Sequence, residues 1–91
     1  MRDESVKANL ALARGGDRRA LDRLLETVHG RLRRLAEGRL GPGLRAKMRT
    51  SDVLQSTYLD VVKSVERFEG EDEEAFVGWV ARIMENNIRD K

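Results

Sequence analysis

Apolar residues recur every three or four positions along four stretches of this chain, and no stretch alternates apolar with polar residues as a half-buried strand does. The chain has 91 residues, and a domain of this size buries only about 60% of the surface that its unfolded chain exposes. The core must therefore be compact and built from few elements. We predict a single all-α domain over residues 1–91, a compact bundle of about four helices.

Glycine and acidic residues set the first helix boundaries. A short helix is predicted over residues 5–14, and Gly15 and Gly16 should end it. Asp17 should cap a longer second helix, because its carboxylate can accept the free amide hydrogens of the first turn. An apolar stripe marks the inward side of this second helix: Leu21, Leu24, Leu25, Val28, Leu32 and Leu35.

The second half of the chain should hold two more helices. The helical pattern breaks at Gly41, which predicts a basic loop from there to Arg49 that includes Arg45 and Lys47. Thr50 or Ser51 should cap the third helix, which continues to residue 68 or so. An acidic turn over residues 69–72 then leads into a fourth helix, which runs from residue 73 into the last few residues.

Charge is distributed unevenly along the chain. Residues 1–50 hold 13 Lys and Arg against 6 Asp and Glu, whereas residues 51–91 hold 5 against 10. The two halves should therefore attract each other. A basic first half suits a polyanionic partner, but arginine is also a good, well-solvated helix former, so the charge alone leaves both interpretations open.

Several functional classes are not indicated. The chain has no cysteine and one histidine, His29, so we expect no disulfide framework, no metal site and no cofactor. His29 has no nearby pattern of nucleophile and base, and an enzyme is not predicted. No run is long and apolar enough for a membrane span, and the first residues lack the apolar stretch of a secretory signal. We therefore expect a cytoplasmic protein.

The third helix has a distinct outer face. The residues predicted to be buried are Leu54, Tyr58, Val61, Val62, Val65 and Phe68. Leu59 lies on the opposite side among polar residues that include Gln55 and Lys63. Such a leucine can be the centre of a docking patch, but a single exposed leucine is also ordinary, and periodicity does not decide between the two.

The fourth helix separates an apolar side from a basic stripe. Phe76, Trp79, Val80 and Ile83 lie within one sector, and the structural interpretation of Trp79 as a core residue competes with base stacking. Asn87 falls among these apolar residues and should satisfy its amide inside the core.

The stripe lies in another sector, roughly 60° wide. It consists of Arg82, Asn86 and Arg89. Guanidinium and carboxamide groups suit single-stranded DNA, although an ordinary solvated face has the same pattern.

Two motifs in this order resemble region 2 of the sigma-70 family, in its extracytoplasmic-function (ECF) type of bacterial sigma factor. The third helix opens with Asp52-Val53-Leu54-Gln55, and the fourth carries the spaced set Phe76, Trp79, Ile83, Asn86 and Asp90. The resemblance extends from about Leu10 to Asp90. It implies a transcription initiation domain that binds the clamp helices of core RNA polymerase and recognises and melts the minus-ten promoter element.

The resemblance also implies which residues act. The polymerase-binding residues would be Asp52, Gln55, Ser56, Leu59 and Asp60. The residues near the non-template DNA strand would be Lys63, Phe68, Arg82, Asn86 and Arg89. In the family, the loop before the fourth helix holds a base flipped out of the duplex, and the cost of flipping is a few kcal/mol.

Three departures from the family pattern are visible. Ser56 stands where an acidic residue is usual, the turn after Phe68 is longer and more acidic, and no second helix-turn-helix domain follows. We therefore expect a fragment of a longer protein, with an anti-sigma factor as a possible partner. The alternative is a helical interaction or regulatory adaptor module, derived from a sigma-like domain, that does not bind DNA.

Overall fold

The computed structural model describes residues 2–45 and 48–89, and the side chains of these except for residues 2–4, 44 and 45. In the described part of the chain, four α-helices and one 3-10 turn follow one another: α1 (Arg2–Arg14), α2 (Arg18–Arg45), α3 (Thr50–Ser64), η1 (Val65–Arg67) and α4 (Glu73–Arg89). No strand occurs among these residues. The predicted all-α class and the number of helices are confirmed.

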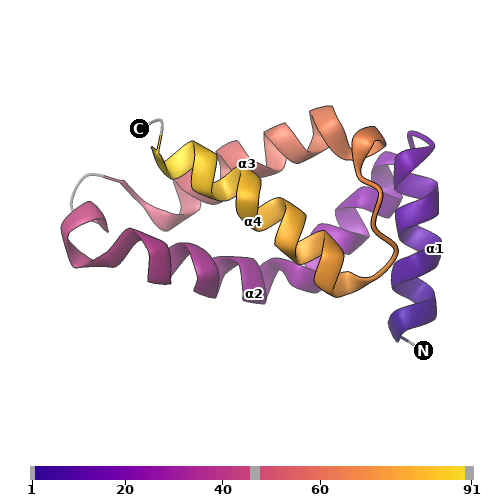
Figure 1. Ribbon diagram of the computed structural model, residues 1–91, viewed down its shortest axis with the longest axis horizontal. Coiled ribbons are helices and arrows are strands. Elements are labelled where there is room, and N and C mark those ends of the chain that lie inside the picture. Colours follow the sequence, from indigo (N-terminus) through magenta and orange to yellow (C-terminus); the bar gives the residue numbers. More distant parts are fainter. Residues whose placement is uncertain (1, 46–47, 90–91) are drawn as a thin grey trace.

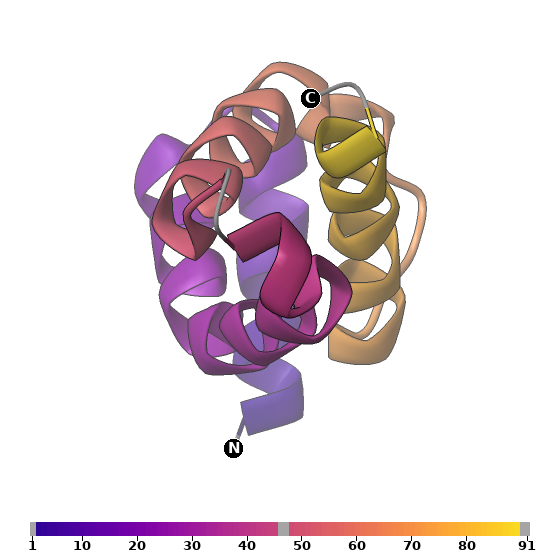
Figure 2. The ribbon, with the colours of Figure 1, turned by 90° about the vertical axis from the view of Figure 1, so that its left-hand side faces the viewer.

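Three helices surround the core, and the remaining helix, α1, crosses one end. In Figure 1, α2, α3 and α4 extend along the long axis of the molecule, and α1 stands across the end where α2 begins. Viewed along that axis, α2, α3 and α4 form the three corners of a triangle (Figure 2). The molecule measures 39 × 25 × 19 Å, and the start of α1 and the end of α4 lie towards opposite ends of its longest dimension (Figure 1).

The connection from α1 to α2 follows the predicted chemistry. Gly16 adopts a φ of +100°, a left-handed conformation that favours glycine and ends the helix. Asp17 then accepts a hydrogen bond at Oδ1 from the amide of Ala20, at 3.1 Å, which confirms the predicted cap. The first helix begins at Arg2 rather than at residue 5.

The predicted basic loop after α2 is shorter than expected. Gly41 breaks the helix with a φ of 61° and a ψ of 172°, as the sequence predicts. One more helical turn then extends to Arg45, because proline fits the first turn of a helix, where its missing N–H has no partner to lose. Arg49 is exposed, whereas the side chains of Arg45 and Lys47 lie outside the described residues.

The predicted cap of α3 is wrong. Neither Thr50 nor Ser51 precedes the helix: Arg49 is the N-cap residue, in an extended conformation, and no side chain caps the helix. The Arg49 carbonyl accepts hydrogen bonds from the amides of Asp52 and Val53. The helix thus starts one residue too early for a cap at Thr50 and two too early for a cap at Ser51. The acidic Asp52 in its first turn suits the positive end of the helix dipole.

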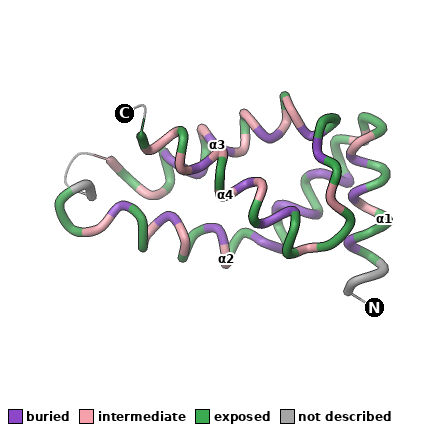
Figure 3. Tube along the Cα trace, viewed as in Figure 1, coloured by how far each residue is buried: buried purple, intermediate pink, exposed green. Residues whose placement is uncertain are grey.

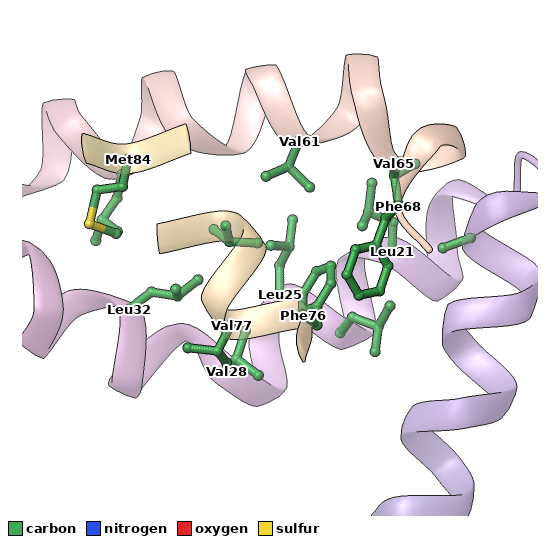
Figure 4. Close-up of a cluster of buried hydrophobic side chains, with 14 of the residues drawn as sticks. Leu21, Leu25, Val28, Leu32, Val61, Val65, Phe68, Phe76, Val77 and Met84 are labelled. Carbon is green, nitrogen blue, oxygen red and sulfur yellow. The ribbon is translucent and has the colours of Figure 1, made fainter. Parts of the chain in front are cut away.

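The core lies between the three long helices (Figures 3 and 4). The α2 stripe is buried as predicted, except that Leu35 is only partly buried. On α3 the buried arc is rotated relative to the prediction: Val53 and Thr57 are buried, whereas Tyr58 and Val62 are half-buried. The rotation has a cause in packing, because α3 contacts both α2 and α4.

Candidate docking groove and nucleic-acid face

A groove lies between α2 and α3, with a volume of about 590 Å³. Its lining comes from both helices: His29, Arg33, Thr50, Ser51, Leu54, Gln55, Tyr58 and Leu59. Leu59 is 56% exposed at its edge, and Leu54 is only 5% exposed. A concave surface with an accessible leucine and several polar groups around it has the character of a docking site for another macromolecule.

The predicted polymerase-binding residues divide into two groups on α3. Gln55 and Leu59 line the groove, and Asp52 is exposed in the first turn. Ser56 and Asp60 are half-buried, and Asp60 accepts a hydrogen bond from Asn87 of α4 at 3.0 Å. The structure therefore brings Gln55 and Leu59 together and directs the Asp60 carboxylate towards α4.

His29 and Tyr58 make a contact on this groove that no sequence pattern predicted. The Tyr58 hydroxyl lies 2.8 Å from Nδ1 of His29, and the two rings meet edge to face with centroids 6.1 Å apart. Burial raises the pKa of Tyr58 to about 12, so the hydroxyl keeps its proton near neutral pH and can donate it to Nδ1. Tyr58 was expected in the core, and helical periodicity does not reveal a hydroxyl at the core's edge.

The basic stripe of α4 is exposed as predicted. Arg82, Asn86 and Arg89 are all exposed, and so is Lys63 on α3. Glu85, which lies between two of these positions in the sequence, pairs with Arg39 of α2. That ion pair neutralises an acidic group next to the stripe. Asp90, the last residue of the motif, lies outside the described residues.

Phe68 lies inside the molecule. Its side chain is 5% exposed, and the ring centroid lies 5.7 Å from that of Phe76 and 5.1 Å from that of Trp79 (Figure 4 shows Phe68 beside Phe76). Phe76 is fully buried and Trp79 is half-buried, which agrees with a core role for this aromatic cluster. A ring buried in this way does not lie at the surface, where it would have to be to contact a DNA base.

Acidic residues of the turn and of the first turn of α4 make structural contacts. Asp72 accepts a hydrogen bond at Oδ1 from the amide of Ala75, at 2.8 Å, as predicted for a cap. Arg31 of α2 donates from Nη1 to Glu73 at 3.0 Å and to Glu74 at 2.8 Å, and from Nη2 to Glu74 at 3.1 Å. The guanidinium lowers the pKa of Glu74 through these hydrogen bonds and its charge. The attraction expected between the two halves of the chain is thus seen in the pairs of Arg31 with Glu73 and Glu74, as it is in the pair of Arg39 with Glu85.

Asn87 satisfies its amide as predicted, but at a half-buried position between α3 and α4 rather than inside the core. Its Nδ2 donates to Asp60 Oδ2 at 3.0 Å and to Thr57 Oγ1 at 3.4 Å. The buried Thr57 hydroxyl in turn donates to the Val53 carbonyl at 2.7 Å. These polar groups join α3 to α4 on the side away from the groove.

The fold and its two surfaces define a small helical domain, with a groove between α2 and α3 and an exposed basic stripe on α4. The family model described as Sigma-70 region 2 matches residues 21–91, and the chain belongs to this family. A role in transcription initiation follows, through binding to RNA polymerase and promoter DNA in general, and the family is not enzymatic. No curated protein and no solved structure matched the chain. In the part of the chain that the structure describes, no helix has the length and apolar character needed to cross a membrane.

Proposed function

We propose that this domain is region 2 of an ECF-type sigma factor and that it binds the clamp helices of core polymerase through the groove between α2 and α3. The observation that carries the proposal is the position of Gln55 and Leu59, two residues that the family resemblance assigns to polymerase binding and that line one groove. Buried Val53 and Leu54 hold this helix in place from beneath.

The basic wall of the groove supports this assignment. Ser56 replaces the acidic residue usual in the family, and it is half-buried rather than exposed at the groove. Arg33 and His29 line the other side of the groove, on α2. In this proposal a carboxylate of the polymerase pairs with Arg33, which provides a charged contact that does not involve position 56.

DNA recognition is assigned to the exposed stripe of α4. Asn86 would contact a base of the non-template minus-ten strand, and Arg82, Arg89 and Lys63 would contact its backbone. Phe68 would act indirectly, as the buried support of the turn. The domain would act in the cytoplasm, and an anti-sigma factor would inhibit it by covering the same groove.

The docking assignment is tested by co-purification with core polymerase. Gln55→Ala combined with Leu59→Asp should reduce retention at least about tenfold, as expected for loss of an interface centre. Leu12→Asp is the matched control, because Leu12 is an exposed leucine on α1, outside the groove, with a similar exposure of 47%. Undiminished retention of the double variant would exclude this groove as the polymerase site.

The DNA assignment is tested in the reconstituted holoenzyme. Asn86→Ala should weaken binding to single-stranded minus-ten DNA by about 1–3 kcal/mol, with polymerase binding unchanged. Promoter opening at the wild-type level would contradict the role of Asn86.

The acidic turn favours a second candidate function. Glu69 and Glu71 are exposed on the turn before α4, where the family resemblance would place a flipped base, and negative charge there repels phosphates. An adaptor that binds polymerase without reading DNA would retain the groove and show no dependence on the minus-ten sequence, which the same holoenzyme experiment measures.

A further inference from the structure

The turn between η1 and α4, residues 68–72, runs beside α1. Figure 1 shows it descending next to the upper half of α1, and a side chain from α1 reaches it. Arg14, the last residue of α1, donates a hydrogen bond from Nη1 to the Phe68 carbonyl at 3.2 Å. The same guanidinium lies 5.9 Å from the centroid of the Phe68 ring, within range of a cation–π contact.

The path of the turn depends on the position of Phe68. A Cβ placed on Gly70 would collide with the Phe68 ring and with Cβ of Ala75, so the Gly70 backbone lies directly against that ring. Any shift of Phe68 therefore moves the backbone that crosses it. Because Arg14 holds the Phe68 carbonyl, it holds the turn as well.

Arg14 also faces the acidic part of the turn. Arg14, Lys7 and Glu71 line a small hollow of about 220 Å³ between α1 and the turn. Two cationic side chains of α1 thus lie across from a carboxylate of the turn. At its other end the turn leads into Glu73 and Glu74, which Arg31 holds.

We infer that Arg14 is a positioning residue for DNA recognition: through the Phe68 carbonyl it sets the conformation in which the turn meets the minus-ten strand. The inference rests on the proposed function and deepens it. It assigns a part in reading DNA to α1, which lies outside the residues that the family model matches. Arg14 itself touches no DNA in this arrangement.

The test compares variants of the full chain in the reconstituted holoenzyme. Arg14→Met keeps the apolar stem but loses the donor and the charge. It should reduce the discrimination between consensus minus-ten DNA and a single-base mismatch by about fivefold, the effect of losing one hydrogen bond that orders the turn. Arg14→Lys, which retains a charged donor, should restore most of the discrimination. Binding to core polymerase should not change.

Trp79 provides a spectroscopic readout of the same contact. It is the only tryptophan, and its ring centroid is 5.1 Å from that of Phe68. Arg14→Met should shift the Trp79 emission, and Arg14→Lys should shift it less. If Arg14→Met does not fold, Arg14→Gln replaces it, because glutamine remains polar but is too short to reach the carbonyl.

The matched control is Arg23→Met. Arg23 of α2 donates from Nε to Asn9 of α1 at 3.1 Å. This variant therefore also removes one arginine hydrogen bond that involves α1, but one that does not involve the turn. It should leave both the discrimination and the emission unchanged. Equal losses in Arg23→Met and Arg14→Met would overturn the inference, as would wild-type discrimination in Arg14→Met. A wild-type chain that does not bind minus-ten DNA would instead contradict the proposed function itself, and the inference with it.

Discussion

Asn87 of α4 donates a hydrogen bond to the Asp60 carboxylate of α3 at 3.0 Å, while its neighbour Asn86 is exposed. Of these two adjacent asparagines, Asn87 therefore faces the contact with α3 and Asn86 faces the solvent. Substitutions at the two positions should affect stability and the proposed DNA recognition separately.

Asn87→Ala should reduce the free energy of unfolding by about 1–2 kcal/mol, because it removes the hydrogen bond to a charged, half-buried carboxylate. Urea denaturation monitored by circular dichroism measures this loss. Asn86→Ala is the control and should change stability by less than about 0.5 kcal/mol. The opposite ranking would contradict the assignment of the two amides.

The ion pairs of Arg31 predict a specific pH dependence. Arg31 lowers the pKa of Glu74 below its ordinary value of 4.5, so the stabilising contribution of this pair is present above 4.5 and is lost as the pH falls through the lowered folded-state pKa of Glu74. The melting temperatures of wild type and Arg31→Met should therefore differ near neutral pH and converge in acid. Arg19→Met, at an exposed arginine of the same helix, should follow the wild type throughout. A difference that persists in acid would show that Arg31 stabilises by packing instead.

Tyr58 should ionise near pH 12 rather than at its ordinary pKa of 10.0. It is the only tyrosine, so the ultraviolet absorbance of tyrosinate reports this residue alone. The unfolded chain ionises first, and stability should therefore fall as the pH rises above 10.

The cause of the raised pKa can be tested separately. Because the main cause is burial, His29→Ala should leave most of the shift in place. Loss of the shift in that variant would assign it to the hydrogen bond with His29.

Two glycines of α2 should respond to alanine in opposite directions. Gly41 has a φ of 61°, where an L side chain is strained, and Gly41→Ala should destabilise the domain by about 1 kcal/mol. Gly38 lies inside the helix with open space around it, so Gly38→Ala should stabilise by roughly 0.5–1 kcal/mol. Thermal denaturation of the two variants measures both changes, and equal signs would contradict the kink at Gly41.

Local chemistry explains which parts of the fold could be predicted. Gly16, Asp17 and Asp72 act through atoms within three residues of their own position. Both partners of each contact are therefore close together in the sequence and could be recognised there. The prediction of the α3 cap was wrong because Arg49, Thr50 and Ser51 are adjacent, and Arg49 takes the N-cap position in an extended conformation without a side-chain cap.

The candidate site was predictable only in part, because its geometry depends on contacts between helices. The spacing of Gln55 and Leu59 placed both on the outer face of α3, and the structure agrees. The groove itself also requires His29 and Arg33 of α2, which no periodicity connects to α3. Periodicity predicted Phe68 to be buried, and the structure agrees, whereas only the family resemblance placed its ring near DNA.

Arg31 and Arg39 link α2 to α4 through ion pairs. The α4 side and the α3 side of the domain should therefore differ in their sensitivity to salt. Dissolved salt weakens such partly exposed pairs, whereas the contact between His29 and Tyr58 on the α3 side joins a ring to a hydroxyl. A rise in ionic strength should therefore loosen α4, which carries the proposed DNA stripe, before it disturbs the docking groove.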